Sequence, residues 1–299
     1  MTAIMSTNAS TIALEGTDPR GTKPSRINPY WALVLPLVLF LVAIYLYPIG
    51  QVLWISFSDP EVGFQNYERL VTNRGILRML GNTFRICFIT TGFSLVLGYL
   101  IAYAMAHVTE RHRIWILMFV LVPFWVSVLA RAFSWVVLLH DNGIINRALM
   151  DWGLTTEPIH LVRNELGVLI GMIHYMIPYA VLPLYANLRG IDPRLVSAAR
   201  GLGAGPFESF WRVYLPLSLP GIAGAGLLVF ILTLGFFVTP SILGGGKTLM
   251  IAEYVSVQIL QTVRWGIGSM LAVVLLILVF LVFAVMSRVV NLRVMFGAK

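Results

Sequence analysis

Six long apolar runs, separated by short polar segments, organise this chain. A helix needs about 20 residues, at about 1.5 Å per residue, to cross a hydrocarbon core of about 30 Å. The runs cover residues 30–57, 82–107, 114–139, 166–188, 217–239 and 269–290. This pattern predicts an all-α membrane protein with six transmembrane helices in one domain over residues 29–291. The polar ends, residues 1–28 and 292–299, are predicted to be tails, the first of them disordered.

The overall composition is typical of a polytopic membrane protein rather than a soluble domain. Of the 299 residues, 58% are hydrophobic and 11% are charged, and the mean hydropathy is +0.84. The net charge of +8 does not indicate nucleic-acid binding, because the basic residues are spread through the segments between the runs. The single cysteine, Cys87, excludes an intrachain disulfide. Membrane lipid is therefore an expected partner, and nucleic acid is not.

The distribution of Lys and Arg predicts which side of the membrane each segment faces. Six spans place both termini on the same side. If that side is the cytoplasm, its segments hold twelve basic residues and the opposite segments hold seven. Because cytoplasmic loops carry the excess of basic residues, we expect both termini and both tails to be cytoplasmic. The segment 189–216 then also faces the cytoplasm.

This basic, glycine-rich segment predicts a short helical hairpin. Asp192 and Pro193 form a typical helix start, an N-cap followed by a residue whose missing N–H costs nothing there. The first helix has an apolar face and a glycine-rich end: Leu195, Ala198, Ala199 and Leu202, then Gly201, Gly203 and Gly205. The second is expected to carry one aromatic stripe and to end at two prolines: Phe207, Phe210, Trp211 and Tyr214, then Pro216 and Pro220. Spacing alone allows either an interfacial hairpin on lipid headgroups or a protein-docking element.

The residue identities favour docking. The stretch SAARGLGAGPFESFWRVYLPLSLPGI resembles the EAA loop of ATP-binding-cassette importer permeases, where Glu-Ala-Ala precedes Leu-Gly-Ala, Phe, Val, Leu-Pro and Pro-Gly. In that family the loop is a coupling helix that sits in a groove of the cytosolic ATPase. The resemblance implies this role for residues 192–205, within a coupling segment of residues 192–214. The implicated residues are Arg194, Ser197, Ala198, Ala199, Arg200, Leu202, Gly203 and Ala204.

One position of the coupling segment departs from the family pattern. Ser197 occupies the place of the family's Glu, so any salt bridge from that Glu to the ATPase is absent. Docking is then expected to depend on shape and apolar contact, with Arg194 and Arg200 as candidate ionic partners.

Further stretches resemble the polyamine (spermidine/putrescine) branch of these permeases over about residues 30–290. They include YLYPIGQVLWISFSD, PFWVSVLARAFSWVVLLHDNGIINRAL and PSILGGGKTLMIAEYVSVQI. The resemblance implies the type I importer fold in a bacterial inner membrane, with a second permease, two cytosolic ATPase subunits and a periplasmic solute-binding protein. The implied function is ATP-driven import of a small solute, a polyamine or a related amine or amino-acid-like compound. An anionic or zwitterionic solute, such as an opine or phosphonate, is the alternative, because the branch includes permeases for these.

Arg131 is the main candidate for the solute path. It lies about 12 Å from the end of the third span, where a charge is costly and is often functional. It would attract an anionic or zwitterionic solute, or else contact a neighbouring helix or a backbone carbonyl. The other candidate lining residues, which packing would also explain, are Trp135, Tyr175, Tyr179 and Phe236. The spans hold no Asp or Glu, which weighs against a polyamine, and the outer acids Asp141, Glu165 and Glu253 are expected to be solvated.

The sequence contains no catalytic or metal-binding motif that we can identify. GGGKT at residues 244–248 is not a nucleotide-binding loop, because Ser241 stands where that motif requires its first glycine. No pair of the five histidines has the H-x-x-x-H spacing of two ligands on one helix face. The chain is expected to be a transport subunit without a cofactor, and a partner ATPase uses the ATP. A stand-alone secondary transporter or channel is the alternative class, although no internal repeat and no intramembrane acid supports it.

Overall fold

A computed structural model of the chain describes residues 30–289, and every regular element in that range is helical. The elements are α1 (Tyr30–Ser58), α2 (Gln65–Thr72), α3 (Arg74–His107), α4 (Glu110–Trp125), α5 (Val128–Leu139), α6 (Ile144–Asp151), α7 (Glu165–Arg189), α8 (Pro193–Gly201), α9 (Pro206–Ser209), η1 (Phe210–Tyr214), α10 (Leu215–Leu234), α11 (Val238–Leu243), α12 (Ile251–Ser256), η2 (Val257–Gln261) and α13 (Trp265–Val289). Six helical segments are long and apolar enough to cross a membrane. The predicted tails, residues 1–28 and 292–299, lie outside the described residues.

The chain divides into two compact units, residues 1–49 and residues 50–299. The first unit contributes the N-terminal part of α1, an apolar helix that continues through Pro36 and Pro48. The second unit contains all the remaining helices and both candidate sites.

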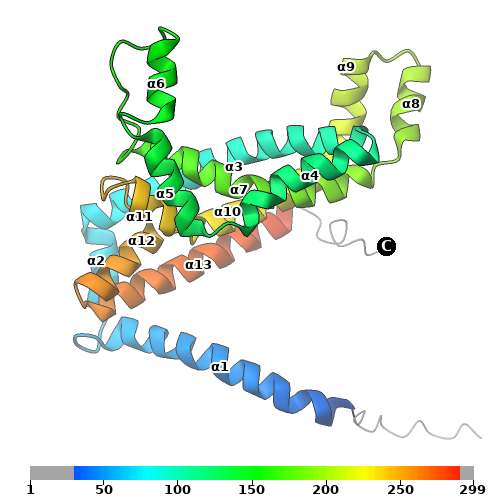
Figure 1. Cartoon of the computed structure of the whole chain (residues 1–299). Coiled ribbons are helices and arrows are strands. Elements are labelled where there is room, and N and C mark those ends of the chain that lie inside the picture. The colour runs from blue at the N-terminus through cyan, green and yellow to red at the C-terminus, as the bar shows by residue number, and fades with distance from the viewer. Residues whose placement is uncertain (1–29, 290–299) are drawn as a thin grey trace, which may run out of the picture. The chain divides into compact units, whose positions relative to one another are not determined.

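The second unit is a bundle built around α3, α7 and α10 (Figure 1). α3 and α7 make the most extensive contact, and α10 packs against both. Their close approach depends on small residues: a Cβ at Gly98 of α3 would lie 2.8 Å from the Cβ of Ala180 on α7. Small residues at such contacts are typical of helices that associate in lipid, where burial of apolar area supplies little driving force.

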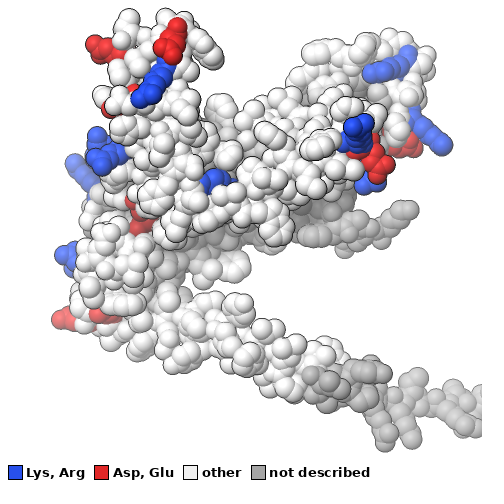
Figure 2. Space-filling model, viewed as in Figure 1, with Lys and Arg blue, Asp and Glu red and all other residues white. Residues whose placement is uncertain are grey.

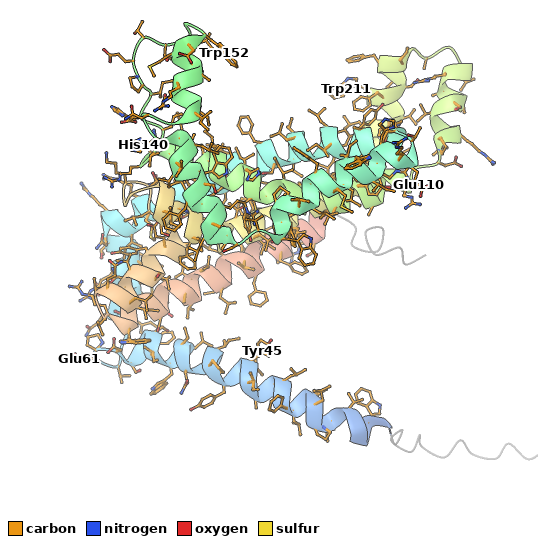
Figure 3. All side chains as sticks on the ribbon, in the orientation of Figure 1. Tyr45, Glu61, Glu110, His140, Trp152 and Trp211 are labelled. Carbon is orange, nitrogen blue, oxygen red and sulfur yellow. The ribbon has the colours of Figure 1, made fainter. Side chains whose placement is uncertain are left out.

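Short helices lie at two opposite ends of this bundle (Figure 1). α8 and α9 form a hairpin at one end, the hairpin end, while α6, α11 and α12 lie at the opposite end. Charged side chains gather at both ends, and the surface between them carries very few in the view shown (Figure 2). Glu110 and Trp211 lie at the hairpin end, whereas His140 and Trp152 lie at the opposite end (Figure 3). Two of the segments predicted to be cytoplasmic, around residues 110 and 200, therefore share one end.

The third candidate span covers Val128–Asp151, and not the single helix that the sequence predicted over residues 114–139. α4 and α5 are separated at Val126 and Ser127, whose backbone is extended, with ψ of 137° and 136°. Together the two helices run from Glu110 at the hairpin end to His140 at the opposite end (Figure 3). Pro123 lies in the last turn of α4, where its missing N–H removes one intrahelical hydrogen bond three residues before the break. The hydropathy pattern did not predict the break, because the residues on both sides of it are apolar.

The fifth span begins earlier than predicted and is not broken by its prolines. α9, η1 and α10 join into one helical segment over Pro206–Leu234. Within it η1 is a π-helical turn, in which the N–H of Leu215 donates to the carbonyl of Phe210. The wider turn lies directly before Pro216 and gives room for a residue without an N–H. The expectation that Pro216 and Pro220 separate the hairpin from the span is therefore wrong.

Candidate functional site

The hairpin begins with the helix cap that the sequence predicted. Asp192 Oδ1 accepts a hydrogen bond from the backbone N–H of Arg194 at 2.9 Å, and Pro193 opens α8. The cap satisfies one of the N–H groups that a helix leaves free in its first turn. The predicted helix start at Asp192 and Pro193 is thereby confirmed.

The end of α8 is a Schellman motif built on Gly203. The N–H of Ala204 donates to the carbonyl of Ala199 at 3.1 Å, and the N–H of Gly203 donates to the carbonyl of Arg200 at 3.0 Å. Gly203 has a φ of +96°, in the left-handed region that favours glycine because it has no Cβ. Backbone geometry therefore fixes the turn between α8 and α9.

The hairpin carries large apolar side chains that the rest of its unit leaves exposed. Leu202 is 91% exposed and Phe207 is 76% exposed, and Leu195 and Trp211 are exposed as well. A groove of about 310 Å³ lies in the hairpin, lined by Ala199, Leu202, Gly203, Ala204, Glu208, Ser209, Arg212 and Val213. Grouped apolar residues of this kind mark a contact surface for protein or membrane.

The aromatic stripe predicted on the second helix is divided between two environments. Phe210 and Tyr214 face the bundle, and their ring centroids lie 5.8 Å and 5.4 Å from that of Tyr103 on α3. Phe207 and Trp211 stay exposed, with their rings 5.9 Å apart. Residues spaced i, i+4 lie on the same face of a helix. The two pairs therefore occupy neighbouring faces, and only the face with Phe210 and Tyr214 is turned to the bundle. One pair anchors the hairpin and leaves the other pair uncovered.

Ser197 and the two arginines of α8 make no ionic contact within the described residues. Ser197 Oγ donates to the carbonyl of Pro193 at 3.1 Å, a bond within the helix. Arg194 and Arg200 are exposed and belong to none of the ion pairs in the described part of the chain. Their role towards an ATPase stays a prediction.

The five residues predicted for the solute path gather beside the break between α4 and α5. Arg131 lies in the first turn of α5, and its Cζ is 4.6 Å from the ring centroid of Tyr175 on α7. The Tyr175 ring lies 4.5 Å from that of Phe236 and 5.7 Å from that of Tyr179. Trp135, one turn further along α5, reaches α7 at His174. All five are half-buried, so each keeps some accessible surface.

Arg131 has the carbonyl partner that the sequence left open as an alternative. Its Nη2 donates to the carbonyl of Val126 at 2.9 Å, an acceptor at the helix break. The face of Tyr175 adds a cation–π contact. The Nε atom is buried and has no hydrogen-bond partner among the described residues. The guanidinium therefore retains an unused donor.

Two further residues of this cluster were not among the sequence candidates. His174 Nδ1 accepts a hydrogen bond from Trp135 Nε1 at 3.3 Å, which places any proton of a neutral His174 ring on Nε2. Phe124, in the last turn of α4, lies 5.3 Å from the ring of Tyr179. Both contacts join residues on different helices, so the local spacing of residues in the sequence could not predict them. The cluster offers aromatic faces for a cation and one guanidinium for an anion.

The three acids expected to be solvated differ in environment. Asp141 lies 3.0 Å from His160 Nδ1, and Glu165 forms an ion pair with Arg85 at 2.9 Å. Glu253 is only 6% exposed, so the expectation is wrong for this residue. Burial raises the pKa of Glu253 to about 7, and a hydrogen bond from the backbone of Met250 opposes the shift. α12 packs against α3, α11 and α13, so elements outside its own helix surround the segment that carries Glu253.

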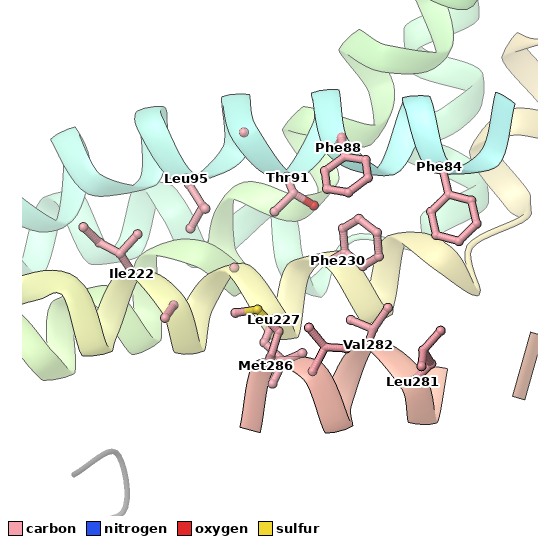
Figure 4. Close-up of a pocket in the computed structure, with 14 residues that line it drawn as sticks. Phe84, Phe88, Thr91, Leu95, Ile222, Leu227, Phe230, Leu281, Val282 and Met286 are labelled. Atoms are coloured by element: carbon pink, nitrogen blue, oxygen red, sulfur yellow. The ribbon is translucent and has the colours of Figure 1, made fainter. Parts of the chain in front are cut away.

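An apolar groove of about 630 Å³ runs between α3, α10 and α13 (Figure 4). Its lining includes Phe88 of α3, Phe230 of α10 and Met286 of α13, and no charged side chain. It therefore offers no group for the charge of a polar solute. Among the described residues, no group of three or more His, Cys, Asp or Glu side chains could hold a metal ion.

The sequence matches the family described as "Binding-protein-dependent transport system inner membrane component" over residues 94–295. It is 34% identical to the spermidine/putrescine transport system permease protein PotB of Haemophilus influenzae over 233 residues, 78% of this chain and 81% of that protein. It is 27% identical to the putative 2-aminoethylphosphonate transport system permease protein PhnU of Salmonella paratyphi A, covering 86% of this chain and 90% of that one. The fold is similar to a chain of a bacterial ABC transporter that imports the acidic polysaccharide alginate. The TM-score is 0.69 at 22% identity, over 87% of this chain and 95% of that chain.

Proposed function

This chain belongs to the family of binding-protein-dependent transport system inner membrane components, and we propose that within it the chain is the permease subunit of a polyamine importer. It is a transport subunit and not an enzyme. The main support for a polyamine as the solute is the 34% identity to a spermidine/putrescine permease over 78% of this chain. The chain itself uses no cofactor in this proposal.

We propose a complex of this chain with a second permease, two cytosolic ATPase subunits and a periplasmic solute-binding protein. The exposed Leu202 and Phe207 beside the fixed turn at Gly203 support docking of an ATPase on the hairpin. The excess of basic residues in the segments assigned to the hairpin side supports a cytoplasmic location for that end. Both termini are then cytoplasmic, in a multi-pass protein of the inner membrane.

The continuous helix from Pro206 to Leu234 supports a mechanical link between the two candidate sites. Its 29 residues span about 43 Å at 1.5 Å per residue. At one end Phe207 and Trp211 are exposed on the hairpin. At the other end, directly after the helix, Phe236 contacts Tyr175 in the cluster around Arg131. A push on the hairpin, produced when ATP closes the ATPase dimer, would thus reach the aromatic cluster through one rigid element.

A second solute class, anionic or zwitterionic, is favoured by Arg131. A fixed guanidinium with an unused Nε donor attracts a phosphonate or carboxylate and repels a polycation. The 27% identity to a permease whose name specifies 2-aminoethylphosphonate points in the same direction. A solute with both an ammonium and an anionic group would use the rings and the guanidinium together.

The test is purification of this chain from its native membrane in mild detergent, identification of the subunits that accompany it, and uptake by the complex in liposomes. ATP-dependent uptake of spermidine or putrescine, with an ATPase and a second permease present, is the expected result. Uptake of an aminophosphonate but not of a polyamine would select the second solute class. Recovery of this chain alone, still moving solute without ATP, would contradict the importer and support a secondary transporter or channel.

A further inference from the structure

Glu253 is the only buried carboxylate among the described residues. It lies on α12, at the opposite end of the bundle from the hairpin, and is 6% exposed. One side of the carboxylate takes the hydrogen bond from the backbone of Met250. Its Oε2 is buried and has no hydrogen-bond partner among the described residues.

The immediate neighbours of Glu253 along α12 pack into apolar clusters. Met250 belongs to a cluster with Val168 and Leu243, and Ile251 belongs to one with Met270. The charged side chains on the near half of α3 are Arg74, Arg78 and Arg85, all exposed, and Arg85 is paired with Glu165. The only charged side chain of α13 is Arg288 in its last turn, and α11 has none. Lys247 in the loop before α12 and Arg264 after η2 are exposed, and neither forms an ion pair with Glu253.

An isolated carboxylate in such surroundings is costly. A buried charge without a partner destabilises the protein by several kcal/mol, so the group either takes up a proton or binds a cation. None of the ion pairs within the described residues involves Glu253. Polar groups retained against such a cost are frequently functional. Glu253 is therefore either protonated or an acceptor for a cation that the described residues do not supply.

The backbone around α12 has features that permit a local change of conformation. Gly245 and Gly246, before α12, have φ of +56° and +76°. After it the π-helical turn η2 leads to Val263, whose φ of +54° is unusual for a β-branched residue. Such positions absorb backbone rotation at the ends of moving segments. Exposure of Glu253 would need rotation at these positions and release of the hydrogen bond from the Ile251 N–H to Thr83 Oγ1 of α3 at 2.9 Å.

We propose that Glu253 is an ammonium-binding residue at the solute-entry end of the bundle, where the carboxylic acid gives up its proton to water as an ammonium group of the solute takes its place. This rests on the proposed function, since both candidate solute classes carry an amine. The carboxylate supplies a negative charge that the six apolar runs of the sequence lack. Without a cation beside it, burial favours the protonated carboxylic acid.

The experiment measures initial uptake of spermidine by the reconstituted complex, with its loaded binding protein, one pH unit below and one above the pKa of about 7. For the wild-type chain we expect kcat/KM to rise with pH, because a proton competes with the ammonium group for Glu253. Glu253→Gln should lower kcat/KM about tenfold, the effect of about 1.4 kcal/mol, and remove this part of the pH dependence. Glu253→Asp should retain part of both.

The matched control is Glu157→Gln, the same chemical change at an exposed acid outside the spans, which should leave uptake and its pH profile unchanged. Thermal unfolding separates a binding role from a structural one: Glu253→Gln should be at least as stable as the wild type above neutral pH, since it removes a buried charge. Wild-type uptake and pH profile in Glu253→Gln would overturn the proposal.

The proposed function fails in a different way. If the wild-type complex imports neither a polyamine nor an aminophosphonate, the proposed function is wrong, and the proposal for Glu253, which rests on it, loses its basis.

Discussion

One backbone angle, at Gly203, sets the direction of the hairpin turn. Its φ of +96° closes the Schellman motif, and no atom lies within 4 Å of the position that a Cβ would take. Substitution therefore acts through backbone strain and not through a clash. Left-handed φ costs a residue with a Cβ about 1–2 kcal/mol. The turn can relieve that strain only if α8 changes its direction relative to α9.

We expect Gly203→Ala and Gly203→Asp to uncouple ATP hydrolysis from transport. A redirected α8 would no longer transmit the ATPase movement, so solute moved per ATP should fall several-fold while hydrolysis continues. Parallel measurement of uptake and phosphate release in liposomes tests this. Gly205→Ala is the control, because Gly205 has an ordinary φ of −67° and equal space around it. Wild-type coupling in Gly203→Asp would contradict the argument.

Glu253 also predicts how stability depends on pH. Burial raises the pKa of Glu253 from an ordinary value near 4.5 to about 7, so between these values the folded protein binds more protons than the unfolded chain. Stability contributed by the protonated form is present below pH 4.5 and is lost as the pH rises through about 7. The melting temperature of the wild type in detergent should therefore fall over this range relative to that of Glu253→Gln. If the melting temperatures of the two proteins change equally with pH, the Glu253 carboxylate is hydrated and the argument fails.

Among the elements, the close packing of α7 and α10 depends on Gly221. A Cβ at Gly221 would lie 2.5 Å from the Cβ of Asn187 in the last turns of α7. We expect Gly221→Ala to push the helices apart and to destabilise the bundle by about 1–3 kcal/mol, with a melting temperature several degrees lower. Gly92→Ala on α3 is the control, because its Cβ would meet no atom within 4 Å. Equal melting temperatures for the two variants would contradict this account.

The same elements show what could and could not be read from the sequence. The cap at Asp192 and the turn at Gly203 were predicted because their determinants lie within a few residues of each other. The break between α4 and α5 was not predicted, because it lies in a uniformly apolar run, and hydropathy alone does not show where a helix within such a run ends. Pro216 was expected to break the chain, yet the π turn η1 before it keeps the helix intact.

At the scale of the whole unit, segments distant in sequence define the environment of each candidate site. Arg131, Tyr175 and Phe236 come from three different parts of the chain and meet through the packing of α5 and α10 against α7. The sequence supplied these residues as separate candidates, and the structure shows that they form one cluster. The burial of Glu253 arises in the same way, from α3, α11 and α13 closing around α12. Residue type and local spacing could not predict these contacts, because they depend on how helices distant in sequence pack together.

The arrangement of segments at the two ends leads to a test of orientation. If the hairpin end is cytoplasmic, a cysteine replacing the exposed Arg200 on α8 should react with a membrane-impermeant maleimide only after the cells are permeabilised. A cysteine replacing the exposed Asp151 on α6 should react once the reagent reaches the periplasm, with the inner membrane intact. The native Cys87 is fully buried and should give no signal in either case, so the unmodified chain serves as the background control. The reverse labelling pattern would place α12 and Glu253 in the cytoplasm, where Glu253 could not receive a solute from outside.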